Sequence, residues 1–273
     1  MGKILFIRGG AVGDFILTMP AIQLVREQLP DNEITVLGYP AICKLAKATG
    51  LVDEIRSIED ANLAHYINPK SELDPDWCQF FAGYDVVVSY LFDPDGFFQG
   101  NLERAGVETL LLAPFKPKDD APFQPAALQL AEPLSRLALF PDDQPMKLQF
   151  TAPIDFEISG NESDVLIGLH PGSGSPSKNW SFEAWADLLA KLHEQDQRVH
   201  FVITSGEAEF ETISSFLELL KLRNVPHSHV TAKSLLEMGS LFGKLDFYLG
   251  HDSGISHLAG STGIPGLLLF GPT

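Results

Sequence analysis

The chain alternates short apolar runs with amphipathic segments, and this alternation constrains its fold more than any other feature. The run Lys3–Arg8 is continuous and apolar, which suits a strand buried on both faces of a parallel sheet. Similar strands are expected at 33–37, 53–58, 84–90, 107–112, 165–169, 199–204 and 247–249, near 148 and 230, and as a second buried closing strand at 266–270. Helices are expected after residue 14 and at 40–49, 126–139, 182–194, 207–220, 235–242 and 255–261. Such an order predicts an α/β fold with parallel sheets.

The length of 273 residues is enough for two domains of ordinary size. Residues 140–163 contain three prolines and several acidic residues, and we take 150–163 as the linker between domains. We therefore predict two Rossmann-like domains, at 1–155 and 156–273.

The composition excludes several classes of protein. The formal net charge is −17 and the acidic excess is spread over both halves, which argues against nucleic acid and against a polybasic membrane patch. Cys43 and Cys78 are far apart, which favours a reducing compartment and disfavours a zinc site. The start does not match a signal peptide, and no apolar run reaches membrane-spanning length. We expect a soluble cytoplasmic protein with at most a peripheral contact with the inner face of the membrane.

The first glycine loop, residues 9–14, follows the first strand. A dinucleotide fingerprint would need glycines at 8, 10 and 13, but position 8 is Arg8, and the second strand ends without an acid for a ribose. What remains is a turn that lets a ligand approach the backbone, with Asp14 at the start of a helix. Asp14 is either a common first-turn acid or a general base at the carboxyl edge of the sheet.

A second loop leaves the strand at 165–169 and ends at Trp180. Its glycines, its serines and Lys178 together resemble a cradle for a diphosphate, although the spacing is not that of a P-loop. The alternative is a Ser/Gly surface loop with a solvated lysine. Trp180 is expected to be a packing residue and His170 a structural histidine.

The closing segment, residues 246–273, reads as strand, tight turn, short helix and strand. The turn places Asp252, Ser253 and free N–H groups at a helix N-terminus, which suits an anion such as a phosphate. Asp252 would repel that anion unless it caps the helix or faces a cation. The alternative is an ordinary capped turn.

Three segments together resemble glycosyltransferase family 9, the ADP-heptose:lipopolysaccharide heptosyltransferases. They are residues 7–14 with Pro20 downstream, residues 170–173 with 178–180, and residues 250–257 followed by 270–273. The resemblance implies a GT-B fold, in which two Rossmann-like domains face a cleft, with the acceptor on the first domain and the donor on the second. It also implies an inverting, metal-independent transfer of a sugar, expected to be a heptose, from an ADP-sugar to a lipopolysaccharide-type or other glycan acceptor.

The resemblance also assigns roles to residues. Asp14 would take the proton of the acceptor hydroxyl, and Lys178 would neutralise the departing diphosphate. Asp252 would contact the donor sugar or order the site. The remaining donor-binding residues would be Gly13, Ser173, Ser175, Ser253, Gly254 and His257, with either Glu207 or Glu209 on the nucleotide ribose. The implied partners are a nucleotide-sugar donor and a glycan or glycolipid acceptor, with no metal or other cofactor.

Two departures from the family pattern are visible. Family members usually continue beyond the motif at 270–273, so we expect a truncated C-terminal domain. An anionic acceptor would also require some of the basic residues of this acidic chain to gather, namely Lys44, Lys47, Lys116, Lys118 or Arg104. The alternatives are another GT-B enzyme, such as a sugar-nucleotide epimerase, and a non-catalytic nucleotide-sugar-binding protein.

Overall fold

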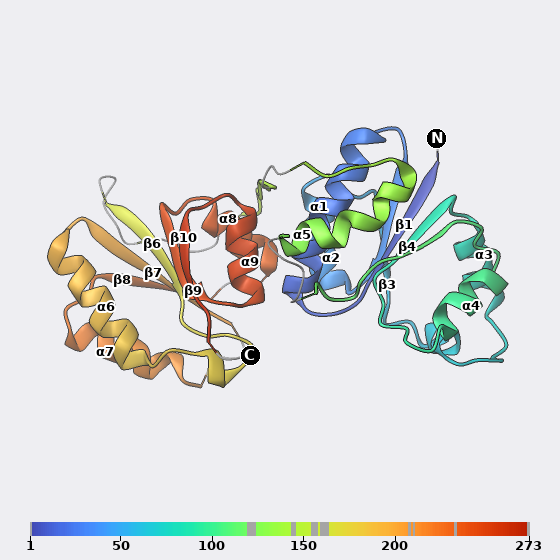
Figure 1. Ribbon diagram of the computed structural model, residues 1–273. Coiled ribbons are helices and arrows are strands. Elements are labelled where there is room, and N and C mark those ends of the chain that lie inside the picture. The colour runs from blue at the N-terminus through green and yellow to red at the C-terminus, as the bar shows by residue number, and fades with distance from the viewer. Residues whose placement is uncertain are drawn as a thin grey trace. The chain divides into compact units, whose positions relative to one another are not determined.

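The computed structural model describes residues 2–118, 124–142, 146–153, 158, 164–206, 209, 211–231 and 234–271. The chain forms two compact units, Met1–Gln144 and Pro145–Thr273 (Figure 1). They divide between residues 144 and 145, whereas the sequence analysis placed the boundary at 155/156. Each unit is a parallel sheet covered by helices on both faces.

The first unit is built on five parallel strands. They are β1 (Lys3–Arg8), β2 (Glu33–Gly38), β3 (Glu54–Ser57), β4 (Val86–Ser89) and β5 (Leu110–Leu112), in the spatial order β3-β2-β1-β4-β5. The central strand β1 pairs with β2 on one side and β4 on the other. The direction of strand succession therefore reverses between β1 and β4, and ligands of open α/β sheets bind at such a reversal, outside the carboxyl ends of the strands.

Helices cover both faces of this sheet (Figure 1). One layer contains α1 (Val12–Gln28), α2 (Pro40–Ala48) and α5 (Ala126–Ala131), the last continued by a 3₁₀ turn, η2 (Glu132–Leu137). The other contains η1 (Ala61–Ile67), α3 (Pro75–Ala82) and α4 (Phe97–Arg104).

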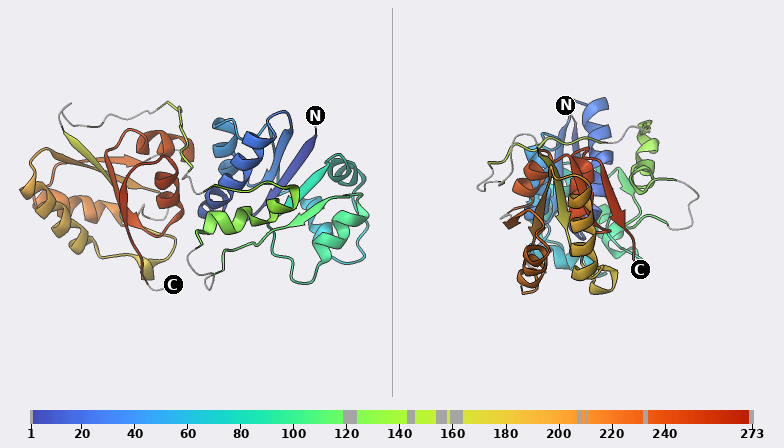
Figure 2. Two further views of the ribbon diagram at one scale, coloured as in Figure 1. Left: turned by 45° about the horizontal axis from the view of Figure 1, so that its top comes forward. Right: turned by 90° about the vertical axis from the view of Figure 1, so that its left-hand side faces the viewer.

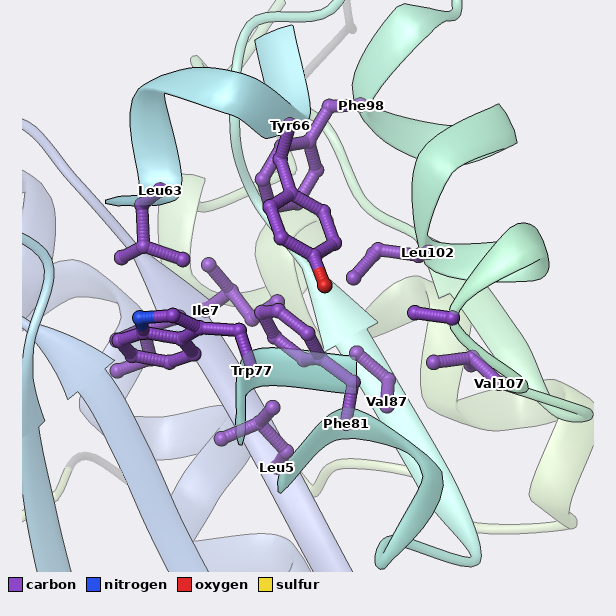
Figure 3. Packing of buried hydrophobic residues seen from close by; sticks show 12 residues of the cluster. Leu5, Ile7, Leu63, Tyr66, Trp77, Phe81, Val87, Phe98, Leu102 and Val107 are labelled. Atoms are coloured by element: carbon purple, nitrogen blue, oxygen red, sulfur yellow. The ribbon is translucent and has the colours of Figure 1, made fainter. Parts of the chain in front are cut away.

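The second helical layer encloses an aromatic core against the sheet. Tyr66, Trp77, Phe81 and Phe98 pack over Leu5 and its neighbours on β1 and β4 (Figure 3). The helices η1, α3 and α4 were not predicted from the sequence. The start of α3 nevertheless carries a signal, because Asp74 accepts hydrogen bonds from two N–H groups of the first turn and Pro75 follows it.

The second unit repeats the architecture. Its strands are β6 (Val165–His170), β7 (Val199–Ser205), β8 (His227–Thr231), β9 (Phe247–His251) and β10 (Gly266–Leu269), in the order β10-β9-β6-β7-β8 and all parallel. Helices α6 (Phe182–Gln195) and α7 (Ile213–Leu222) cover one face, and α8 (Leu235–Phe242) and α9 (Gly254–Ser261) cover the other (Figure 2). The reversal lies between β6 and β9.

Several details of the prediction are wrong. The closing strand β10 is not buried: among the described residues it pairs only with β9, and Leu267 is 54% exposed. No strand forms at Leu148, whose N–H donates to the carbonyl of Ser261 from irregular backbone. The helix expected from 207 begins at Ile213, although 207, 208 and 210 lie outside the described residues. The helix expected at 126–139 changes to 3₁₀ geometry at Glu132, beside Pro133, whose ring nitrogen cannot donate.

No helix among the described residues is long and apolar enough to cross a membrane.

The aromatic core of the first unit is expected to dominate its stability. Replacing the fully buried Phe81 by alanine removes contacts with Tyr66 and Trp77 and leaves a cavity, which costs about 3–5 kcal/mol. Hydrogen exchange of the β1 and β4 amides, measured by mass spectrometry, should show this loss. The exposed Phe140, replaced by alanine as a control, should lose under about 0.5 kcal/mol. A loss below about 1 kcal/mol at Phe81 would contradict the packing described here.

Candidate functional site

The glycine loop of the first unit presents a carboxylate at the carboxyl edge of its sheet. Gly10 has φ 96°, and a Cβ there would lie 2.6 Å from Oδ2 of Asp14, so only glycine fits. Oδ2 of Asp14 accepts a hydrogen bond from the N–H of Ala11 at 2.9 Å. The carboxylate stays partly exposed. Asp14 is thus a first-turn acid that a ligand can also reach, and both of its predicted roles are compatible with this geometry. Gly13 lies in the same first turn and is buried.

Arg8, which the sequence analysis did not identify as a site residue, organises this loop. Its side chain is 3% exposed, and Nε and Nη2 donate to the main-chain carbonyl of Asp14 at 3.3 and 3.2 Å. Nη2 also lies 3.6 Å from Oδ1 of Asp14. Nη1 donates to the carbonyls of Tyr90 and Phe115 at 3.3 and 2.8 Å. Burial lowers the pKa of the guanidinium and the Asp14 carboxylate opposes that shift. The sequence signal that could have revealed this role is an arginine at the end of an otherwise apolar strand.

In the second unit, Lys178 and Asp252 form an ion pair between the loops that follow β6 and β9. The distance from Nζ to Oδ2 is 2.8 Å, and both side chains are about one-quarter exposed. His257 lies beside the other oxygen of this carboxylate, with Nε2 3.8 Å from Oδ1 of Asp252. Asp252 therefore faces a cation, which was the condition under which it could stand beside a bound anion.

The N-terminus of α9 follows directly after Asp252. The hydroxyl of Ser253 caps the helix by accepting the N–H of Ser256 at 3.2 Å. Within the part of the chain that the structure describes, no protein acceptor is recorded for the N–H groups of Gly254 and Ile255. Those donors carry the positive end of the helix dipole and suit an oxyanion beside Lys178.

The loop after β6 is held by its own hydrogen bonds. The hydroxyl of Ser173 donates to Oδ1 of Asn179 at 2.6 Å or to the carbonyl of Ser175 at 2.9 Å, and Ser175 contacts the hydroxyl of Ser177. Ser173 therefore helps to hold the loop, and its role as a donor to the diphosphate stays a prediction. Gly271, after β10, packs on the backbone of Lys178, where a Cβ would lie 2.9 Å from the Lys178 Cα.

A buried carboxylate ties the loop after β7 to the loop after β6. Glu209 accepts the N–H of Gly206 at 2.9 Å, and a Cβ on Gly172 would overlap Oε1 of Glu209. His170 lies 3.8 Å from the same carboxylate and pairs with the Thr204 hydroxyl at 3.0 Å. Burial lowers the pKa of His170, while Glu209 opposes that shift. The predicted alternative, Glu207, lies outside the described residues.

His251 is a second residue that the sequence analysis missed. It ends β9, is fully buried, and its Nε2 accepts the N–H of Trp180 at 2.8 Å. Since Nε2 accepts, the proton of the neutral ring lies on Nδ1. Burial lowers the pKa of His251, which favours this neutral form. Trp180 packs edge-on against Trp185, as expected of a packing residue, although its own ring is partly exposed.

The basic residues considered for an anionic acceptor are distributed over different places. Lys44 and Lys47 line a cavity of about 640 Å³ along β3, together with Arg56. The same cavity contains three aspartates, so it is not a purely basic groove; they are Asp60, Asp74 and Asp76. Arg104 bonds the side chain of Asn101 and the carbonyl of Ser71, and Lys116 lies over the ring of Phe115. Over the described ranges, no group of three or more potential metal ligands was found.

Comparison with known proteins identifies the class. The fold is that of GT-B glycosyltransferases. The sequence model of glycosyltransferase family 9 (heptosyltransferase) matches residues 123–273, and the chain belongs to that family, as the three motifs predicted.

Individual relatives agree with this assignment. Lipopolysaccharide core heptosyltransferase OpsX of Haemophilus influenzae is 29% identical over 140 residues, which cover 51% of this chain and only 37% of that protein. A family 9 glycosyltransferase of Veillonella parvula superposes with a TM-score of 0.72 at 18% identity, covering 98% of this chain and 80% of that one. Heptosyltransferase WaaC of E. coli, solved with ADP, superposes with a TM-score of 0.69 at 15% identity, covering 99% and 88%. At such identities the superpositions show the fold.

The contact of Gly172 with Glu209 predicts strong coupling between the two positions. Gly172→Ala alone should destabilise the second unit by roughly 1–3 kcal/mol, because the new methyl group displaces a buried carboxylate. In a Glu209→Ala background the atoms that clash are gone, so the same change should cost at least about 1 kcal/mol less. Hydrogen exchange of β6 and β7 gives the four free energies of this double-mutant cycle. Additivity within about 0.5 kcal/mol would contradict the contact.

Proposed function

We propose that the chain is an inverting, metal-independent glycosyltransferase that moves a heptose from an ADP-sugar to a lipopolysaccharide-type or other glycan acceptor. The observation that carries the proposal is the Lys178–Asp252 pair beside the N-terminus of α9. It stands at the carboxyl end of β9, where the second sheet reverses and where ligands of open α/β sheets bind. Family membership and the ADP named for the E. coli structure support the choice of donor.

The donor diphosphate is assigned to the second unit. An ammonium group has three N–H donors, so Lys178 can keep Asp252 and still donate to a phosphate oxygen. The N–H groups of Gly254 and Ile255 supply further donors. As the sugar leaves, negative charge grows on the departing phosphate, and fixed donors beside it can contribute several kcal/mol.

The acceptor hydroxyl is assigned to the first unit. In the proposed step its oxygen forms a bond to the anomeric carbon from the face opposite the diphosphate. The bond between that carbon and the phosphate oxygen breaks, ADP leaves with the electron pair, and Asp14 takes the hydroxyl proton. A single displacement of this kind inverts the anomeric configuration. Arg8 holds Asp14 in place by donating two hydrogen bonds to the main-chain carbonyl of Asp14.

The test is product analysis by mass spectrometry and NMR, with ADP-heptose, heptose-deficient lipopolysaccharide and EDTA. Transfer with inversion in the presence of EDTA would support the whole proposal. ADP binding without any transfer would favour the non-catalytic nucleotide-sugar-binding alternative, and an isomerised donor would favour the epimerase. A cytoplasmic location with contact at the inner face of the membrane belongs to the same proposal and is tested by cell fractionation.

Asp14→Asn should separate chemistry from binding. The amide oxygen can still accept the N–H of Ala11, so the loop should keep its shape, while the base is lost. Transfer should slow by about two to four orders of magnitude, with ADP affinity unchanged. The exposed Asp31, changed to asparagine, is the matched control. Transfer at the wild-type rate in Asp14→Asn would remove Asp14 from the mechanism.

Lys178→Ala should weaken donor binding as well as turnover. Losing a charged donor to the diphosphate should raise the Kd for ADP roughly tenfold or more, measured by calorimetry. Lys191→Ala, which removes an exposed lysine from α6 of the same unit, should leave ADP binding unchanged. Equal ADP affinity in both variants would show that Lys178 pairs with Asp252 without contacting the donor diphosphate.

A further inference from the structure

An exposed aromatic pair lies at the carboxyl edge of the first sheet. Phe92 follows β4 and is 67% exposed, and Phe115 follows β5 and is 39% exposed. Their ring centroids are 4.7 Å apart and the rings are tilted by 59°. Large apolar side chains that gather on a surface commonly mark a binding site.

The pair stands where the strand order of the first sheet reverses. The N–H of Tyr90 donates to the carbonyl of Ile7 at 2.9 Å, which continues β4 alongside β1. Leu91 follows Tyr90 and packs on the glycine loop. Its Cδ2 lies 3.3 Å from the position that a Cβ on Gly9 would take. The loop that carries Phe92 is therefore in contact with the glycine loop that precedes Asp14, at the point where ligands of open α/β sheets bind.

One guanidinium binds the main chain of Phe115 and the main chain of the candidate base. Nη1 of Arg8 donates to the main-chain carbonyl of Phe115 at 2.8 Å, and Nε and Nη2 donate to the main-chain carbonyl of Asp14. The segment that carries Phe115 and the first turn of α1 are therefore neighbours at one edge of one unit.

The described segments that carry the two rings are anchored by hydrogen bonds. Beyond Phe92, Asp93 accepts the N–H groups of Phe98 and Gln99 at 3.1 and 2.9 Å, which fastens the loop to the start of α4. Beyond Phe115, the N–H of Lys118 donates to Oε1 of the buried Gln129 at 2.8 Å. Side chains on ordered loops lose little conformational entropy when a ligand binds.

We propose that Phe92 and Phe115 form a platform on which the apolar face of an acceptor sugar ring stacks while its hydroxyl reaches Asp14. The C–H groups of a pyranose face complement the negative face of an aromatic ring. Lys116, whose Nζ lies 5.7 Å from the centroid of the Phe115 ring, stands beside the platform and matches a carboxylate or phosphate on the acceptor. The inference rests on the proposed function and names the acceptor side of the same reaction.

A lipid bilayer is the competing occupant, because aromatic rings with lysines beside them also suit a membrane interface. The shared contact with Arg8 favours the sugar, since it ties the main chain of Phe115 to that of the candidate base.

The experiment uses the full chain and a deacylated, heptose-free lipopolysaccharide oligosaccharide, which cannot insert into a membrane. Its binding is measured by calorimetry, and transfer from ADP-heptose by steady-state kinetics. Phe92→Ala and Phe115→Ala should each raise the Kd and the acceptor KM roughly three- to tenfold, with kcat and the Kd for ADP unchanged. Phe115→Tyr should retain wild-type values. Phe140→Ala, at 65% exposure in the same unit, is the matched control and should change nothing.

The outcomes separate the platform from the proposed function. Weaker oligosaccharide binding in both alanine variants supports the platform, even if no transfer is seen and the glycosyltransferase proposal fails. Transfer with unchanged acceptor KM in both variants leaves the glycosyltransferase proposal standing and overturns the platform. The alanine variants could instead bind the oligosaccharide as the wild type does but co-sediment less with phosphatidylethanolamine–phosphatidylglycerol vesicles. That result assigns the rings to lipid and also overturns the platform. A wild-type chain that neither binds nor glycosylates the oligosaccharide rejects both.

Discussion

The parallel direction of every strand is the constraint on which the rest of the structure depends. In each unit the five carboxyl ends meet at one edge, so loops far apart in the sequence become neighbours there. At that edge of the first unit, Arg8 joins the loops after β1, β4 and β5 through three main-chain carbonyls. At the corresponding edge of the second, the Lys178–Asp252 pair joins the loops after β6 and β9. The charged side chains of Arg8, Lys178 and Asp252 thus hold together loops that lie beyond the ends of the paired strands.

Glycine provides the space that these carboxylates need. Gly10 combines a left-handed backbone with close contact to the Asp14 side chain, and Gly172 leaves room for the buried carboxylate of Glu209. Gly271 allows the segment after β10 to lie directly on the backbone of Lys178. The glycines of the motifs therefore serve packing of loop against loop, in addition to any close approach of a ligand.

The strands could be predicted because a strand buried on both faces needs a continuous apolar run, as in Lys3–Arg8. The residues beside the site were harder to predict. Arg8 and His251 end buried strands, and their importance comes from partners more than seventy positions away, such as Tyr90 and Trp180. The exposure of β10 was also unpredictable, because an edge strand and a central strand can have the same apolar sequence. The motifs at Asp14, Lys178 and Asp252 revealed the family because they are local in sequence, whereas Phe92 and Phe115 meet only in the folded unit.

The central claim is that the carboxyl edge of the second sheet holds an ADP-sugar. It is tested most directly by calorimetric titration of the chain with ADP, ADP-heptose, UDP and NAD in the presence of EDTA. We expect saturable binding of ADP and ADP-heptose, with UDP and NAD bound much more weakly. A folded chain that binds neither ADP nor ADP-heptose, or that binds NAD as tightly as ADP, would contradict this assignment.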